Sequence, residues 1–499
     1  MSSSDWIESR LRRRMNGHVP GMLGRLASTV AVAAIARHER AVPYWPIERI
    51  KALQRRRLEV LLRHAQATVP FYRDALRESG LRPDGIASAA DLARLPMIDG
   101  AALAEDPMRF VAEPFRRGGR EVFKTSGSSA GLRKPIFWDH GSLLLRAARG
   151  ERDRVVIAAL AGESWAQVIA REFLTNERRH TLARWLGIRT LEHQRLLILP
   201  ADFSSRTQRT IYSERTVIPR KPVHYHHLPP AVPFHVAAAQ IIALKPRVVL
   251  SFGSYADQFF HFLHGSGMRI PLPRLWVYLG DRLSAGGREL AESMGCAVYA
   301  VYGAMEAGTI GFQCERRDGF HLNLDLCAVR IADAEGNDLP PGESGDVVIS
   351  PLDNRAMVLL NYRLGDRAAI APEPCACGRS LPLLVRMEGR RSEIIRLADG
   401  RELSSLAIEA SFGAELRRTI QAQIDQETPW RLRWRVVASV PAEKEALRDA
   451  FVRRSRQVLG AATTLEVEFV EQIARTPAGK FMRMRASTAQ PPLAVRDTL

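Results

Sequence analysis

The sequence is poor in cysteine and has no long hydrophobic run. It contains five cysteines in 499 residues, which excludes a secreted fold held together by disulfides. The longest apolar run near the start, residues 26–36, is about half of a membrane span. Asp5 and Glu8 come too early for a signal peptide. These absences predict a cytoplasmic protein.

Acidic residues are also scarce relative to basic ones. The chain has 54 aspartates and glutamates against 72 lysines and arginines, for a net charge of +18. This excess predicts an anionic partner such as a nucleotide or an anionic membrane surface. Zinc-finger, RNA-binding-sheet and basic-zipper patterns are absent, so no nucleic acid is expected. Residues 22–36 predict a helix that either lies on a surface or packs against the protein, and both alternatives stay open.

From residue 235 onward the pattern alternates between helices and short strands, which predicts a mostly parallel sheet in an α/β fold. Ligands bind at the carboxyl ends of such strands. Three consecutive predicted strands end in small or polar residues, at 251–253, 280–281 and 302–306. The sequence therefore predicts one binding cleft at this edge of the sheet.

The remaining chain divides into further units. Residues 1–44 read as a basic helical extension and 45–388 as the large domain, which ends in a small β-rich subdomain after Gly311. A hinge is expected at 389–393, followed by a small mobile α+β domain over 394–499. Residues 141–162 are predicted to be helical, and Ser88 to cap a short helix.

A loop rich in glycine and hydroxyl groups follows the strand-like run at 121–124. Its residues are Thr125, Ser126, Gly127, Ser128, Ser129 and Gly131. Because glycine removes the Cβ, backbone N–H groups and hydroxyls in such a loop can close around a phosphate. A flexible turn without a ligand is the alternative. The loop lacks the Gly-Lys-Ser/Thr ending of a Walker A motif.

Four short motifs follow one another along the chain: TSGSSAG at 125–131, VYGAMEAG at 301–308, NYRLGD at 361–366 and ARTPAGK at 474–480. In this order they resemble the core motifs of the AMP-forming acyl-adenylating superfamily. The similarity is greatest to the phenylacetate–CoA ligase branch and its capsule-biosynthesis relatives. It covers roughly residues 45–485 and implies an enzyme with a large domain and a small mobile C-terminal domain.

The resemblance implies a role for each motif residue. The loop from Thr125 would hold the β- and γ-phosphates of ATP, and Glu306 would hold Mg²⁺. Lys480, from the mobile domain, would bind the α-phosphate and the carboxylate of the substrate. The other nucleotide-binding residues would be Tyr302 and Gly303 at the adenine, Asp366 at the ribose hydroxyls and Arg390 at the ribose or phosphate.

The implied reaction activates an aryl or acyl acid as an acyl-adenylate with release of pyrophosphate, then transfers the acyl group to coenzyme A. The acid pocket is placed at or near the strand ends, on Ser251, Phe252, Tyr255, Gly280 and Ala304. An amine, a hydroxyl or a carrier-protein thiol could replace coenzyme A as acceptor. A different class of function is also possible from the sequence, namely a vestigial nucleotide fold that binds anionic surfaces. The sequence leaves open whether the protein forms a homodimer.

The sequence departs from the superfamily pattern at several positions. Ala130 stands where the phosphate loop usually has glycine, Ser392 stands at the hinge position, and Gly280–Asp281 stands where Gly-Glu is common. These departures bear mainly on the coenzyme A step.

Two groups of residues suggest a metal. Cys314, His321, Cys375 and Cys377 form the pattern Cys-x₆-His … Cys-x-Cys, a donor set that tetrahedral zinc accepts. The resemblance implies a structural zinc at these positions, as in some members of the branch, whereas ordinary buried cysteines and a structural histidine are the alternative. His224, His226 and His227 fit a metal site, and a loop or an edge strand is the alternative. Cys296 and Cys327 are expected in the core.

Overall fold

The computed structural model describes residues 8, 10–12, 19–125, 134–164, 195–200, 205–217, 225–397, 399–460, 463–476 and 479–485. The glycine-rich loop after Thr125 and His224 therefore lie outside the described residues. No helix among these residues is both long and apolar enough to cross a membrane.

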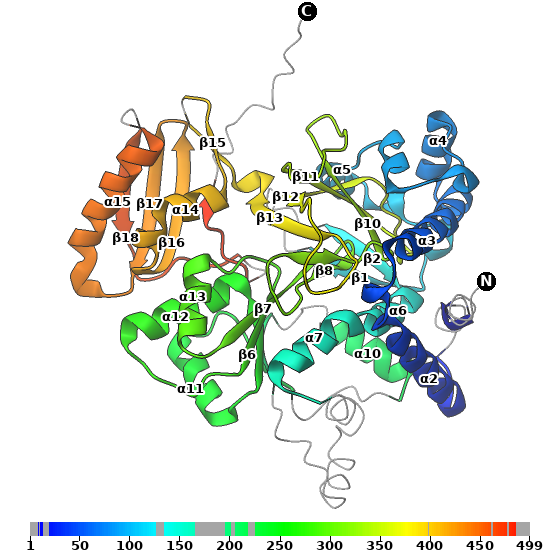
Figure 1. Ribbon diagram of the computed structural model, residues 1–499, viewed down its shortest axis with the longest axis horizontal. Coiled ribbons are helices and arrows are strands. Elements are labelled where there is room, and N and C mark those ends of the chain that lie inside the picture. The colour runs from blue at the N-terminus through cyan, green and yellow to red at the C-terminus, as the bar shows by residue number, and fades with distance from the viewer. Residues whose placement is uncertain are drawn as a thin grey trace, which may run out of the picture.

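An eleven-stranded sheet forms the centre of the large domain (Figure 1). Strands β3 to β7 run parallel to one another, and β8 to β13 extend the sheet from β7 with antiparallel pairs. Across the sheet the order is β10 (Cys327–Ala332), β11 (Gly345–Pro351), β12 (Tyr362–Ile370), β13 (Leu383–Arg390), β9 (Phe320–Leu322), β8 (Gly308–Phe312), β7 (Ala297–Ala304), β6 (Leu275–Leu279), β5 (Val248–Phe252), β3 (Arg195–Ile198) and β4 (Tyr225–Leu228).

Helices cover both faces of the parallel part, because alternate side chains of each strand point to opposite faces. Trp276 and Tyr278 of β6 belong to the core beneath α11 (Phe234–Leu244), α12 (Gly253–Ser266) and α13 (Ala285–Ser293). Leu275 and Val277 belong to the core on the opposite face, together with residues of α7 (Glu151–Ala161). The α/β fold class predicted from the alternating pattern is confirmed.

The strands predicted as a small β-rich subdomain continue the central sheet. The chain reverses after Ala304, and Val301 of β7 pairs with Phe312 of β8. Hydrogen bonding therefore passes without a break from the parallel to the antiparallel strands. The helix predicted over 141–162 is divided at Gly150 into α6 (His140–Arg149) and α7.

The N-terminal part is mostly helical and packs on the antiparallel strands. Ser88 caps the 3₁₀ helix η3 as predicted, in a capping box with Asp91. The remaining elements are α2 (Met22–Glu39), η1 (Val42–Tyr44), α3 (Ile47–Thr68), α4 (Pro70–Ser79), η2 (Pro83–Gly85), η3 (Ala89–Arg94), α5 (Gly100–Glu105), η4 (Pro107–Phe110), η5 (Glu113–Phe115), the hairpin β1 (Arg120–Lys124) and β2 (Pro135–Asp139), and α10 (Ser205–Arg215).

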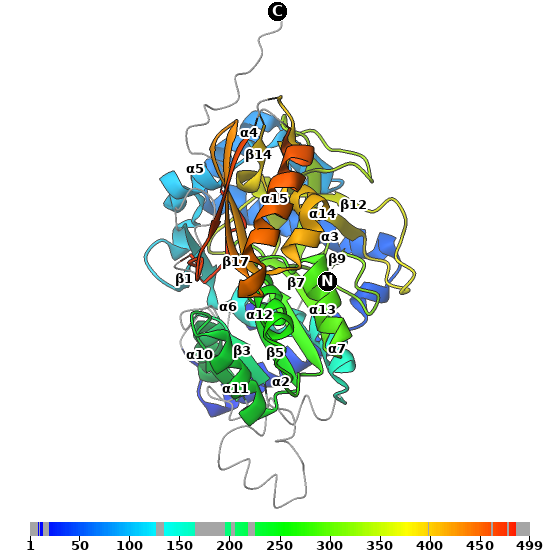
Figure 2. The same ribbon diagram turned by 90° about the vertical axis from the view of Figure 1, so that its left-hand side faces the viewer.

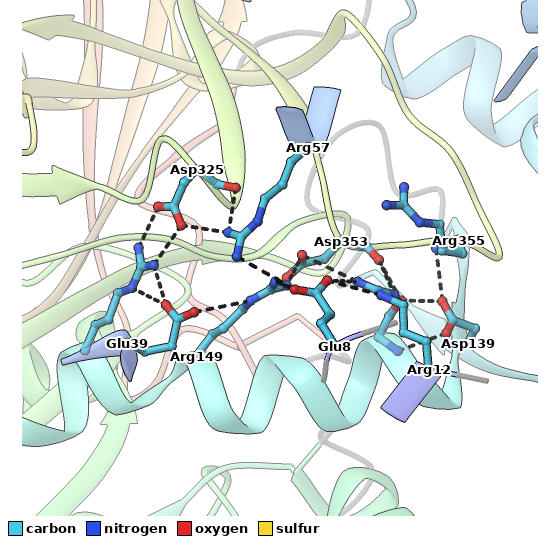
Figure 3. Close-up of polar contacts among 11 residues, drawn as sticks. Glu8, Arg12, Glu39, Arg57, Asp139, Arg149, Asp325, Asp353 and Arg355 are labelled. Atoms are coloured by element: carbon cyan, nitrogen blue, oxygen red, sulfur yellow. Dashed lines mark hydrogen bonds and ion pairs between the residues drawn. The ribbon is translucent and has the colours of Figure 1, made fainter. Parts of the chain in front are cut away.

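Buried ion pairs fix the start of the chain to the large domain (Figure 3). Glu8 accepts hydrogen bonds from Arg12 and from Arg149 of α6, the latter at 2.8 Å. Eight side chains share nine ion pairs in this cluster, and they are Glu8, Glu39, Asp325 and Asp353 with Arg12, Arg57, Arg149 and Arg152. We call these eight residues the buried ion cluster.

The C-terminal part has its own four-stranded sheet and its own core around Phe412, Trp434 and Phe451. Figure 2 views the molecule from this side, with α15 and β17 in front. After η6 (Arg391–Glu393) come β14 (Ile395–Arg396), β15 (Glu402–Leu403), α14 (Ser405–Leu416), β16 (Thr419–Thr428), β17 (Arg431–Ala438), η7 (Pro441–Glu443), α15 (Lys444–Leu459), β18 (Thr464–Phe469) and β19 (Met484–Arg485). The hinge at 389–393 and the other domain boundaries stay predictions.

Candidate active site

The β1–β2 hairpin closes the base of the glycine-rich loop. The Thr125 N–H donates to the Lys134 carbonyl at 2.9 Å, and the Lys134 N–H donates to Thr125 Oγ1 at 2.9 Å. Two antiparallel strands held this way bring both ends of a loop to one point. The loop residues 126–133 themselves lie outside the described residues.

A buried carboxylate lies next to this hairpin. Glu306 follows β7, and its Oε1 is 3.3 Å from Lys134 Nζ and accepts a hydrogen bond from Tyr362 Oη at 3.2 Å. Lys134 Nζ also donates to Tyr362 Oη at 2.8 Å. Burial and the Glu306 carboxylate raise the pKa of Tyr362, which keeps its hydroxyl protonated as a donor. The sheet thus holds Glu306 beside Lys134, at the base of the glycine-rich loop.

A second carboxylate lies across the sheet. Asp366 of β12 pairs in register with Arg390 of β13, and Arg390 Nε is 3.6 Å from Asp366 Oδ1. Tyr302 Oη donates to Asp366 Oδ2 at 2.9 Å, and burial together with Asp366 raises the pKa of Tyr302. One carboxylate, one guanidinium and one aromatic ring therefore meet at this point.

Lys480 of the C-terminal part reaches the sheet of the large domain. Its Nζ donates to the carbonyl of Gly280, at the end of β6, at 2.6 Å. Burial and the nearby Arg390 lower the pKa of Lys480 to about 8, against the opposite effect of Asp281, Asp366 and Glu393. Lys480 therefore lies close enough to Asp366 and Arg390 for their charges to act on it.

Two glycines let the Lys480 side chain approach. Gly280 has φ +81°, and a Cβ there would lie 3.1 Å from the Phe252 ring and 3.4 Å from Lys480 Cε. Gly479 has φ +81°, and a Cβ there would lie 2.9 Å from Pro230. Larger residues at either position would be strained and would push the lysine away from the strand end.

The predicted acid-pocket residues differ in what they contact. Phe252 lies against Gly280 and 6.0 Å below Lys480 Nζ. Ser251 is fully buried, accepts a hydrogen bond from Trp276 Nε1 at 2.8 Å and donates to the Phe252 carbonyl. Tyr255 is fully buried on α12, with the Arg475 guanidinium 5.2 Å over its ring. Ser251 and Tyr255 are therefore buried beneath the end of β5 and do not face solvent. Ala304 at the end of β7 is partly exposed.

Known proteins are similar to this chain in sequence and in fold. No protein-family model matches the chain. A phenylacetate–coenzyme A ligase of Thermus thermophilus is 25% identical over 362 residues, covering 70% of this chain and 72% of that enzyme. A phenylacetate–coenzyme A ligase of Aromatoleum evansii is 24% identical over 372 residues, with 70% and 73% covered. The chain is a homologue of phenylacetate–CoA ligases.

The fold agrees with this homology over nearly the whole chain. The crystal structure of 2-hydroxyisobutyryl-CoA ligase in the postadenylation state matches with a TM-score of 0.65 at 18% identity, covering 95% of this chain and 94% of that one. The match includes both parts of the chain, so the fold is that of the adenylate-forming ligases.

The motif reasoning missed several residues that shape the cleft. Tyr362 lies inside the NYRLGD motif and donates to Glu306, and Lys134 contacts both of these side chains from the end of the glycine-rich loop. Asp281 was treated as a strand end, but it caps α12 by accepting from Ser254 N at 2.9 Å and Ser254 Oγ at 2.6 Å. Arg475 of the ARTPAGK motif donates to Ser254 Oγ at 3.3 Å. These roles depend on partners far away in sequence.

The predicted Cys/His group does come together. The ligand atoms of Cys314, His321, Cys375 and Cys377 all lie within 4.8 Å of one another. The Cys314 and Cys375 sulfurs are 3.8 Å apart, the separation of about 3.8 Å expected for two thiolates on tetrahedral zinc. His321 Nδ1 is 3.1 Å from the Leu381 carbonyl, which leaves Nε2 facing Cys377 Sγ at 3.3 Å. The donor set fits zinc.

The other histidine group does not form a comparable cluster among the described residues. His226 and His227 lie on β4, the edge strand of the sheet, as the alternative prediction had it. Cys296 and Cys327 are buried in the hydrophobic core, which confirms the expectation for both.

Proposed function

We propose that this chain is an ATP-dependent carboxylic acid ligase that forms an acyl-adenylate, releases pyrophosphate and transfers the acyl group to coenzyme A. The observation that carries the proposal is the contact of Lys480 with the strand end at Gly280, beside Asp366 and Arg390. The homology to phenylacetate–CoA ligases supports an aryl or acyl acid as the substrate.

In this proposal the nucleotide lies between the two carboxylates. The hairpin at Thr125 and Lys134 positions the loop that holds the β- and γ-phosphates. Asp366 accepts hydrogen bonds from the ribose hydroxyls, with its orientation fixed by Tyr302 and Arg390. Gly303 and Tyr302 form the wall for the adenine. Glu306 holds Mg²⁺, which neutralises phosphate charge when bound.

Lys480 supplies the positive charge for the first half-reaction. The carboxylate of the acid attacks the α-phosphorus of ATP, the bond to the β-phosphate bridging oxygen breaks, and pyrophosphate leaves. Negative charge accumulates on the α-phosphate oxygens, and a buried ammonium stabilises it more strongly than an exposed one would. For the second half-reaction the C-terminal part moves away, and the coenzyme A thiolate displaces AMP from the acyl carbon.

The test is pyrophosphate exchange into ATP across a panel of aryl and aliphatic acids, followed by addition of coenzyme A. Acid-dependent exchange and a thioester product are the expected results. Exchange without thioester would move the proposal to an amine, hydroxyl or carrier-protein acceptor. Absence of exchange with every acid by the folded, Mg²⁺-supplied protein would contradict the proposal and favour a vestigial fold.

We further propose that Cys314, His321, Cys375 and Cys377 hold a structural zinc ion. Four protein ligands leave no open position for catalysis. The purified protein should contain one equivalent of zinc by elemental analysis, and Cys375→Ser should lose the metal and unfold at a lower temperature. Cys296→Ala is the matched control, because it removes a core thiol but no ligand. A Cys375→Ser protein with full zinc content and unchanged unfolding would contradict the site.

The location and assembly also belong to the proposal. The +18 net charge and the few cysteines support a cytoplasmic protein with an anionic partner. Size-exclusion chromatography with light scattering tests whether it forms a homodimer.

A further inference from the structure

Helix α2 presents an apolar face to the solvent. Met22, Leu23, Leu26 and Val30 are 68%, 84%, 51% and 63% exposed. The other exposed positions between them and residue 36 are all alanines, at 27, 33 and 34. We call these seven residues the apolar face of α2. An apolar helix face of this kind normally contacts another protein or a membrane.

The opposite side of α2 is fixed to the protein, so the helix cannot turn this face inward. Arg25 donates to the carbonyls of Thr216 at 2.9 Å and Ser213 at 2.6 Å, and Thr29 Oγ1 accepts from Val217 N at 3.0 Å. Ile35 packs with α6 in a small hydrophobic core. Polar contacts and packing together hold the apolar face outward.

This concentration of exposed apolar side chains is unusual within the molecule. Among the described residues, fourteen large hydrophobic side chains are exposed, and five of them lie between residues 19 and 30. The other nine are spread along the rest of the chain. Scattered single exposures are ordinary, whereas a contiguous group marks a contact surface.

The charge of the residues in and next to α2 indicates which partner its apolar face binds. Residues 19–38 contain two arginines, Arg25 and Arg37, and no acidic residue, and Glu39 at the end of α2 is buried and paired with Arg149 and Arg152. A second copy of this chain, itself at +18, would bring the same positive charge to the contact and be repelled. An anionic lipid surface offers an apolar interior to the helix face and negative charge to the arginines.

We propose that the apolar face of α2 binds the surface of an anionic lipid bilayer. The helix would lie in the plane of the interface, with Met22, Leu23, Leu26 and Val30 inserted among the acyl chains. Figure 1 shows α2 at the outer edge of the large domain, on the side away from the C-terminal part. Binding there leaves the nucleotide cleft and the movement of the C-terminal part unobstructed.

The test is co-sedimentation of the full chain with lipid vesicles. Vesicles of equal parts phosphatidylglycerol and phosphatidylcholine should bind the protein, pure phosphatidylcholine should bind it weakly, and salt should reduce binding. The double variant Leu23→Asp, Leu26→Asp should bind at least about ten-fold more weakly. Ile242→Asp, at a residue 45% exposed on α11, is the matched control and should bind as the unchanged protein does.

Thermal unfolding and pyrophosphate exchange of the double variant should match those of the unchanged protein, because the substituted side chains are exposed. Failure of the unchanged protein to bind anionic vesicles would overturn the proposal, as would full binding by the folded double variant. Self-association that the double variant abolishes, without vesicle binding, would assign the face to a second copy and also overturn it.

Discussion

Two arginine-rich contacts of this molecule, the buried ion cluster and the contact with the C-terminal part, differ in the number and burial of their ion pairs. The buried ion cluster joins the start of the chain to the large domain, and each of its four carboxylates has at least two arginine partners (Figure 3). The contact between the large domain and the C-terminal part has fewer ion pairs among the described residues, and they link Arg282, Glu409, Arg483 and Asp257. The difference indicates which contact can open during a reaction cycle.

The buried ion cluster excludes water. The side chains of Arg149 and Arg152 are 2% and 1% exposed. Burial alone would lower the pKa of Arg149, but Asp353, Glu8 and Glu39 raise it. Removing one member leaves its partners charged and buried, a situation that costs several kcal/mol. This contact is therefore built to stay closed.

The contact with the C-terminal part is polar, and the side chains of its ion pairs are more exposed than Arg149 and Arg152, at 9% to 26%. Arg483 Nη2 is 2.8 Å from Asp257 Oδ2, Arg282 pairs with Glu409, and Gln421 Nε2 donates to Gln258 at 3.1 Å. A cavity of about 30 Å³ lies among Asp257, Gln258, His261, Gln421 and Arg483. Both sides of such a contact can be solvated when they separate, so opening it costs little. That property suits the movement proposed for the C-terminal part between the two half-reactions.

The largest effect is expected from breaking the buried ion cluster. Arg149→Met should lower the free energy of unfolding by about 3–5 kcal/mol, because Glu8, Glu39 and Asp353 lose a shared buried partner. Guanidinium unfolding followed by tryptophan fluorescence measures it. Arg82→Met, in an exposed pair with Asp84, is the control and should leave the unfolding curve in place. Equal curves for all three proteins would show that the cluster contributes nothing.

A smaller and different effect is expected at the movable contact. Arg282→Met removes the pair with Glu409 and should slow pyrophosphate exchange about three- to ten-fold, because the C-terminal part is positioned less often for adenylation. The free energy of unfolding should change by less than about 1 kcal/mol. Arg288→Met, beside Glu292 on α13, is the matched control. Destabilisation as large as that of Arg149→Met would erase the distinction between the two regions.

The smallest effect is expected from pH. The ammonium of Lys480, whose pKa is about 8, is the form that stabilises phosphate charge, so it is present below that pH and lost above it. The kcat/KM for ATP should therefore fall about four-fold between pH 7 and pH 8.5. Lys480→Arg, which stays charged, should show no such fall in its residual rate. A flat profile for the unchanged protein would contradict the lowered pKa.

The alternating helices and strands could be predicted from the sequence, because hydrophobic periodicity is a local pattern. The site motifs could also be recognised, because each is a short continuous stretch. The Cys/His cluster could be predicted as well, because Cys314 and His321 lie close in sequence, as do Cys375 and Cys377. The sequence did not indicate the continuation of one sheet through β8 to β13 or the buried ion cluster. Glu8 and Asp325 are 317 positions apart, and only the folded chain brings both of them to Arg57. Such long-range pairings leave no periodic signal in the sequence.

The most direct test of the account compares the two half-reactions in Lys480→Met. Pyrophosphate exchange should fall about 10²- to 10³-fold, because the charge at the α-phosphate is lost. Thioester formation from a supplied acyl-adenylate should stay within about three-fold of the unchanged protein, because the C-terminal part has by then moved. An equal loss in both half-reactions, or exchange that survives the substitution, would contradict the role assigned to the closed contact.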